Sequence, residues 1–158
     1  MGLDAFVFCD CYEKGWLKRK PPDPDLVYVL PNGDLACRSK VSKVVERFDR
    51  WRGKACEHEA GMAAGDWLGN ASMVGSIRNE LSRRPRDFTT LLKRVIYSGS
   101  HCGDHLTLKQ VAKLQMELDR LKAHRSGNKE LDRGIEQLRR QLQKLVHASL
   151  KIGKPIAF

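Results

Sequence analysis

Three short stretches of the chain carry side chains that can bind a metal or move a proton. They are residues 9–11 (CDC), residues 56–59 (CEHE) and residues 98–105 (SGSHCGDH). Thiolate and neutral imidazole are ligands that Zn²⁺ favours, and four of them from two or three segments can close a tetrahedral site. The candidate metal ligands are Cys9, Cys11, Cys56, His58, His101 and His105.

The spacing of these residues differs from the common zinc motifs. The chain has no C-x-x-C pair, and His101 and His105 lie in a glycine-containing loop rather than on a helix with an H-E-x-x-H pattern. Free cysteine also packs like a small hydrophobic residue, so Cys9 and Cys11 can equally belong to a core. A hydrogen-bonded structural role is therefore the expected one, and zinc binding is the alternative.

The same stretches supply groups for hydrolytic chemistry, namely Glu57, His58, His101 and Asp104. Such catalysis needs a nucleophile or activated water, a base with a pKa near neutrality and a group that stabilises an anion. The chain has no Walker-type phosphate loop, dinucleotide fingerprint or G-x-S-x-G sequence, which excludes the commonest nucleotide-binding and acyl-transfer enzymes. We expect a non-catalytic protein, with a hydrolytic or metal-dependent enzyme as the alternative.

Residues 56–59 and 101–105 are expected to lie close together in the most polar cleft of the protein. Each is a short irregular segment at the edge of a helix, and an antiparallel helix pair of about thirty residues between them would return the chain to its starting end. Polar groups buried apart from one another would cost about 1 to 3 kcal/mol each, which favours mutual pairing.

Strand patterns come early in the chain. Residues 3–12 alternate in a way that places Leu3, Ala5, Val7, Cys9 and Cys11 on one face. Short apolar runs at 27–30 and 35–37 flank an Asn-Gly turn, the strongest local signal for a hairpin. The closing residues KPIAF could add a short final strand.

Helical periodicity dominates the rest of the chain. Apolar residues at helical spacing predict a helix from Val41 to near Gly53, a second from Trp67 to Leu81, and a third that Asp87 caps. The basic residues at 18–20 and in the first of these helices are expected to be solvated.

A helical hairpin is predicted over residues 107–151. Thr107 and Gln110 form a capping box at its start, and its turn lies near Gly127. Its leucines recur in steps of four and three, a pattern that fits packing within the chain or, alternatively, the seam of a homodimer.

These elements predict an α+β fold, in which a small antiparallel sheet of mainly N-terminal strands is covered by about five helices. The length of 158 residues suits a single domain with a sizeable core. Within it, residues 1–105 would form the α+β core, 106–151 the hairpin and 152–158 the tail.

The charge points to an acidic partner. There are 29 Lys and Arg against 19 Asp and Glu, a formal net charge of +10, and residues 106–158 contribute 12 basic and 5 acidic side chains. We expect a basic cytoplasmic protein that docks an acidic protein partner, in the manner of an immunity protein or a regulator. Nucleic acid is only the second alternative as a partner. The chain has no known nucleic-acid-binding module, and acidic residues are interleaved with the basic ones. The expected docking residues are Arg120, Arg133, Arg139, Arg140 and Lys144.

The cysteines and the N-terminal sequence favour the cytoplasm. Five cysteines are an odd number, and the start, MGLDAFVFCDCY, has no basic leader. No apolar run approaches the length that spans a membrane, so no membrane association is expected.

Four stretches, MGLDAFVFCDCYEKG, FDRWRGKACEHEAG, VIYSGSHCGD and GKPIAF, together resemble a group of small uncharacterised bacterial cytoplasmic proteins. The similarity runs nearly end to end. It implies an independent one-domain bacterial protein, and it implies no activity, cofactor or catalytic residue.

Overall fold

The computed structural model describes residues 2–158, and its fold is α+β, as predicted. A four-stranded antiparallel sheet has the order β4-β1-β6-β5, and a second sheet pairs β2 with β3. The strands are β1 (Gly2–Phe8), β2 (Val27–Val29), β3 (Leu35–Cys37), β4 (Met62–Asn70), β5 (His105–Leu106) and β6 (Ile156–Ala157). The helices are α1 (Ser42–Arg52), α2 (Ala71–Leu81), α3 (Leu108–Leu121) and α4 (Lys129–Ile152), with a π-helical turn at Leu91–Val95 and 3-10 turns at Pro24–Leu26 and Glu59–Gly61.

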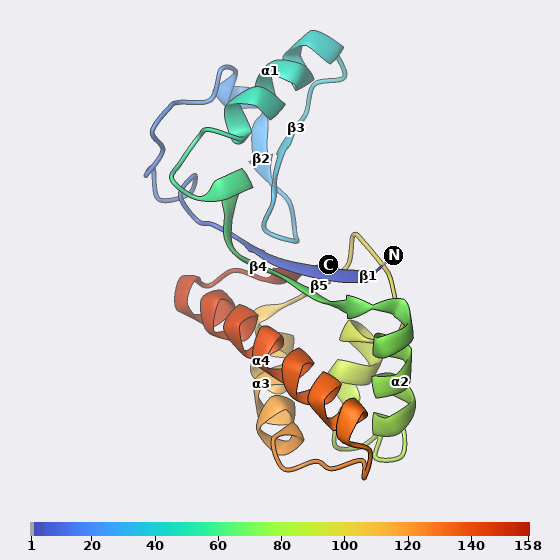
Figure 1. The fold of residues 1–158 in the computed structure, drawn as a ribbon. Helices are drawn as coiled ribbons and strands as arrows, with labels where there is room; N and C mark the ends of the chain where they lie inside the picture. The colour runs from blue at the N-terminus through green and yellow to red at the C-terminus, as the bar shows by residue number, and fades with distance from the viewer. Residues whose placement is uncertain (1) are drawn as a thin grey trace.

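The four-stranded sheet lies between two bodies of unequal size. Helices α2, α3 and α4 cover one face, whereas β2, β3 and α1 lie beyond the other side of the sheet (Figure 1). This smaller body, residues 9–61, leaves the sheet at the end of β1 and returns at the start of β4; we call it the insert lobe. The insert lobe has a small apolar cluster of its own, formed by Phe48, Trp51 and Ala55 with half-buried neighbours.

The larger core forms between the sheet and the helices. Leu3, Ala5 and Val7 of β1 are fully buried there, as the alternation of the sequence predicts. Six leucines of the α3–α4 hairpin are buried in the same core, so their heptad-like spacing reflects packing within the chain: Leu114, Leu118, Leu121, Leu138, Leu142 and Leu145. Because burying one such side chain contributes about 1.5 to 3 kcal/mol, this core is the main source of stability.

Several local predictions for the C-terminal region are confirmed. The capping box of Thr107 and Gln110 begins α3, and Asn128 caps α4 through its side-chain oxygen. Gly153, in the left-handed conformation, ends α4 and turns the chain into β6, the predicted final strand. Within residues 2–158, none of the helices is both long enough and apolar enough to cross a membrane.

The make-up of the main sheet differs from the prediction. The first strand ends at Phe8, and β2 with β3 forms a separate sheet, while β4, β5 and β6 complete the sheet around β1. The predicted helix from Trp67 is wrong in its first part, because Met62–Asn70 is a strand and Asn70 caps a helix that begins only at Ala71. Gly65 leaves room for the side chain of the paired residue, because a Cβ at this position would lie 3.1 Å from the Phe6 ring.

The predicted third helix, capped by Asp87, is also wrong in extent. Only the π-helical turn Leu91–Val95 forms, although Phe88 and Ile96 are buried as expected. The carboxylate of Glu117, on α3, accepts hydrogen bonds from the backbone N–H groups of Thr90 and Leu91 at 2.7 and 2.8 Å. A buried side chain from a distant helix thus satisfies the backbone donors that a local cap would otherwise bind.

Candidate metal centre

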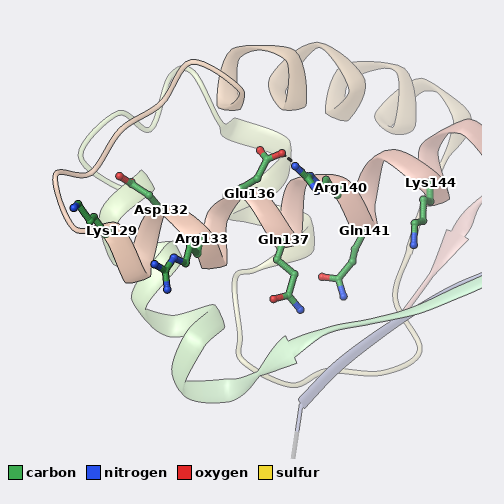
Figure 2. A pocket seen from close by; sticks show the side chains of 8 residues that line it. All are labelled: Lys129, Asp132, Arg133, Glu136, Gln137, Arg140, Gln141 and Lys144. Carbon is green, nitrogen blue, oxygen red and sulfur yellow. Dashed lines mark hydrogen bonds and ion pairs between the residues drawn. The ribbon is translucent and has the colours of Figure 1, made fainter.

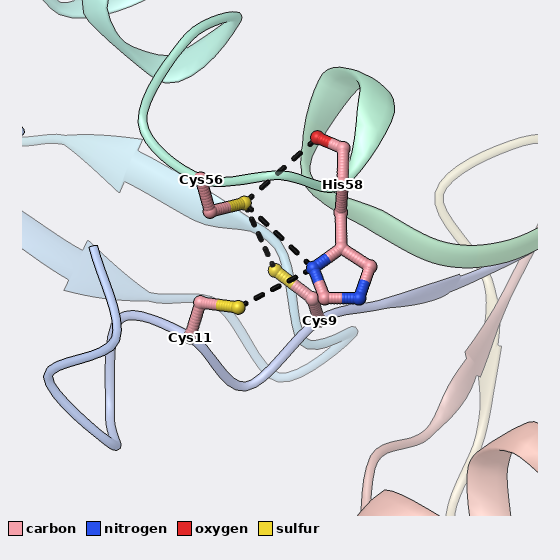
Figure 3. A group of neighbouring side chains, drawn as sticks. All are labelled: Cys9, Cys11, Cys56 and His58. Atoms are coloured by element: carbon pink, nitrogen blue, oxygen red, sulfur yellow. Dashed lines mark hydrogen bonds between the residues drawn. The ribbon is translucent and has the colours of Figure 1, made fainter. Parts of the chain in front are cut away.

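Four of the six candidate metal ligands lie together in the insert lobe. The ligand atoms of Cys9, Cys11, Cys56 and His58 are all within 4.8 Å of one another. The Cys9 and Cys56 sulfurs are 3.7 Å apart, and His58 Nδ1 is 3.3 Å from Cys11 Sγ and 3.9 Å from Cys56 Sγ. Figure 3 shows the three sulfurs and the imidazole converging on one point.

The main sheet brings the two halves of this cluster together. Phe8 pairs with Met62 where β1 ends and β4 begins, and the next backbone hydrogen bond joins Cys9 N–H to Gly61 O at 2.8 Å. The segments beyond the pairing must therefore run side by side. Cys9 and Cys11 lie where the chain leaves β1 and begins a turn, and Cys56 and His58 lie in a bend just before the 3-10 turn at Glu59–Gly61.

The spacing of the ligand atoms suits a tetrahedral metal ion. Zn–S bonds of about 2.3 Å and Zn–N bonds of about 2.1 Å place two sulfurs about 3.8 Å apart, and a sulfur and a nitrogen about 3.6 Å apart. The three distances given above lie within 0.3 Å or so of these values. A Cys3His set with this geometry could hold a metal ion, and its chemistry fits zinc.

The surroundings of the thiols favour their protonated form when no cation is bound. Burial raises the pKa of Cys9, and burial followed by the neighbouring thiols raises the pKa of Cys11 to about 12. Three thiolates could not share so small a volume without a compensating positive charge. A divalent cation provides that charge and displaces the protons when it binds.

His101 and His105 lie away from this cluster. His105 is on β5, where it pairs with Ala157 of β6, and β5 and β4 are at opposite edges of the sheet. His101 Nε2 is 2.9 Å from Val95 O, and its Nδ1 is 3.2 Å from Asp104 Oδ2. The predicted cleft between residues 56–59 and 101–105 is therefore wrong, because pairing in the sheet separates the two segments.

The loop around His101 closes over the C-terminal residue. The His101 ring lies against Tyr97, at 4.4 Å between ring centroids, and against Phe158, at 5.2 Å. Tyr97 OH donates a hydrogen bond to Asp104, which lowers the pKa of Asp104 and raises the pKa of Tyr97. Backbone hydrogen bonds from Gly103 N–H to Phe158 O and from Phe158 N–H to Asp104 O also join this loop to residue 158. The contacts of the loop therefore have a structural role.

We expect His101→Ala to lower the melting temperature and to leave the metal content unchanged. The imidazole is 6% exposed, and its removal deletes the contact of Nε2 with Val95 O and the ring packing against Tyr97 and Phe158. A loss of about 1 to 3 kcal/mol corresponds to roughly 3 to 10 °C in a domain of this size. Calorimetry and metal analysis on the same sample measure both quantities, and an unchanged melting temperature would contradict the structural role.

The four catalytic candidates do not converge. Glu57 is exposed and its carboxylate is 3.0 Å from Lys18 Nζ, whereas His58 belongs to the thiol cluster. His101 and Asp104 form the separate contact at the C-terminus. Among the residues that the structure describes, these four therefore form no common acid–base site.

Four of the five expected docking residues, Arg120, Arg139, Arg140 and Lys144, have partners within the chain. Glu136 binds both Arg139 (2.8 Å) and Arg140 (2.7 Å), and these two guanidinium groups lower the pKa of Glu136 to about 2. Arg139 is also half-buried, so it contributes little to an exposed basic surface. Arg120 donates to Asp87 O at 3.4 Å, and Lys144 Nζ is 3.6 Å from Asp66.

A hollow of about 780 Å³ lies along the outer face of α4. Arg133, Arg140 and Lys144 line it, as Figure 2 shows, but so do the carboxylates of Asp132 and Glu136. Docking of an acidic partner on this surface stays a prediction, and the two carboxylates oppose it.

Comparisons with protein-family models, with curated proteins and with solved structures found no match.

Proposed function

We propose that this chain is a non-catalytic zinc-binding protein in which one Zn²⁺ joins the entry and the exit of the insert lobe, and that it acts by docking an acidic partner. The observation that carries the zinc proposal is the convergence of Cys9, Cys11, Cys56 and His58 within 4.8 Å. The net charge of +10 supports the acidic partner.

The number of protein ligands favours a structural over a catalytic metal. Structural zinc sites have four protein ligands, whereas catalytic sites have three and leave a position for water or substrate. The cluster supplies three thiols and one imidazole, so a tetrahedral ion bound by all four has no open position. This supports a binding protein rather than the metal-dependent hydrolase considered as the alternative.

The position of the cluster supports a role in holding the insert lobe. Cys9 and Cys56 bracket most of that lobe, and backbone hydrogen bonds join Trp16 N–H to Cys11 O and Lys18 N–H to Ala55 O at 2.8 Å each. A metal bound here would link the entry and exit of the lobe at one point. The cytoplasmic location expected from the cysteines belongs to the same proposal, because reduced thiols are the form that binds zinc.

Metal analysis of protein purified without chelator tests the zinc proposal. We expect one zinc ion per chain, and after exchange with Co²⁺ we expect the intense visible absorption of tetrahedral thiolate-bound cobalt. Cys56→Ser should reduce the zinc content at least tenfold, while Cys37→Ser, a half-buried thiol of β3 outside the cluster, should retain it. Full-length reduced protein that contains no zinc and takes up none would refute the proposal.

A further inference from the structure

The insert lobe carries a second feature, a groove of about 490 Å³ between α1 and the loop at residues 18–22. Trp51 lies in this groove but is 8% exposed, so it offers little ring surface to a ligand. The other lining residues, apart from Pro22, are cationic and exposed: Arg19, Lys20, Arg47, Arg50 and Lys54. No carboxylate lines the groove, in contrast to the hollow along α4.

The positive charge of the groove is mostly uncompensated. Arg47 pairs with Asp23 at 2.8 Å at the margin of the groove. Across residues 2–158, no carboxylate forms an ion pair with the other four cations; Arg50 only donates to the backbone O of Glu46. An anion can therefore bind these donors without breaking ion pairs within the protein.

Hydrogen bonds hold the two walls of the groove in place. Trp51 Nε1–H, on α1, donates to Arg19 O on the opposite wall at 2.8 Å. Lys18 N–H donates to Ala55 O, directly before the zinc ligand Cys56. The prolines at 21 and 22 restrict the backbone of the loop. Fixed walls reduce the entropy lost when a ligand orders the side chains.

We propose that this groove binds the phosphate backbone of nucleic acid. The proposal rests on the proposed zinc-binding function and names the class of its acidic partner. Arginine guanidinium groups match phosphate oxygens with two parallel hydrogen bonds, and the groove contains three arginines. Protein interfaces have an apolar or aromatic centre, whereas this groove exposes no aromatic ring and only one apolar residue, Pro22, so phosphate fits it better than an acidic protein surface.

The binding should be weak, independent of sequence and sensitive to salt. Four unpaired cations that each neutralise one phosphate of a single strand give a slope of log K against log salt of about −3. Raising the salt concentration from 50 to 200 mM should then weaken binding roughly sixtyfold. The only aromatic residue of the groove, Trp51, is buried, so the groove offers no ring on which a base could stack.

Fluorescence anisotropy with a labelled 20-nucleotide oligothymidine tests the proposal on the full-length zinc-loaded protein. Arg50→Gln with Lys54→Gln should weaken binding about tenfold and reduce the salt slope by about 1.4. The matched control is Arg86→Gln with Lys113→Gln, which removes the same two kinds of charge from exposed positions outside the groove and should change binding less than twofold. Unlabelled polyglutamate serves as competitor to detect an acidic-polypeptide site.

Three outcomes would overturn the proposal: no binding at 50 mM salt, equal weakening by both double variants, or displacement by polyglutamate as effectively as by unlabelled oligonucleotide. The last would assign the groove to an acidic polypeptide. Zinc content is measured on every sample. Arg50 and Lys54 are not metal ligands, so the double variant should keep its zinc. A variant that loses oligonucleotide binding but keeps zinc separates the groove from the metal site, whereas wild-type protein without zinc refutes the proposed function independently.

Discussion

Replacing Cys11 with serine is expected to abolish zinc retention and to unfold the insert lobe while the helical core stays folded. The apolar cluster of the lobe is small, with three buried residues, Phe48, Trp51 and Ala55. A body of about fifty residues with so small a core needs a disulfide or a metal for stability. Structural zinc supplies about 10 to 16 kcal/mol in isolated zinc-finger peptides, far more than such a cluster.

Hydrogen exchange read out by mass spectrometry checks this result segment by segment. In Cys11→Ser, and in the wild type treated with a chelator, peptides from α1 and from the β2–β3 hairpin should lose protection, whereas peptides from α4 keep it. Cys37→Ser is the matched control, because Cys37 packs in the same lobe but lies outside the metal cluster. Full protection of α1 in the zinc-free protein would contradict a metal-dependent lobe.

Replacing Glu117 with alanine should destabilise the larger core by about 2 to 4 kcal/mol. The Glu117 side chain is the partner of two backbone N–H groups, those of Thr90 and Leu91, and the residue is 6% exposed. Alanine would leave both donors buried without an acceptor. The π-helical turn Leu91–Val95, which depends on them, carries Leu91 and Val95 into the core, so the loss extends to apolar packing.

Urea denaturation followed by circular dichroism measures this effect. Glu117→Gln keeps one carbonyl acceptor and should recover part of the loss, which separates the hydrogen bonds from side-chain volume. Asp119→Ala, at an exposed position of the same helix, should change the free energy of unfolding by less than about 0.5 kcal/mol. A Glu117→Ala variant as stable as Asp119→Ala would show that these two hydrogen bonds do not stabilise the fold.

The sequence alone determines the elements whose signals are local. The helical hairpin, the capping box at Thr107 and the β2–β3 hairpin at Asn32-Gly33 each depend on residues a few positions apart, and the structure confirms all three. The α+β class follows from the same signals. Charge and composition likewise determined the net basic character, but not which surface uses it.

The tertiary structure decides what depends on distant residues. Met62–Asn70 is a strand because it pairs along β1, which supplies backbone partners that a local pattern cannot reveal. The spacing of Trp67 and Ala71 fits a helix only by coincidence, since the two residues lie on opposite sides of the Asn70 cap. No local pattern marks Glu117 as buried, and only the fold brings its carboxylate within hydrogen-bond distance of Thr90 N–H.

The metal cluster shows both contributions. The sequence supplied the ligand types and two pairs of candidate ligands, each with a single intervening residue. It could not select Cys9, Cys11, Cys56 and His58 from six candidates. That selection follows from the pairing of β1 with β4, which joins segments 47 residues apart and leaves His101 and His105 at the other edge of the sheet. The individual residues determine which ligand types are present, whereas a site formed by two distant segments exists only when strand pairing brings those segments together.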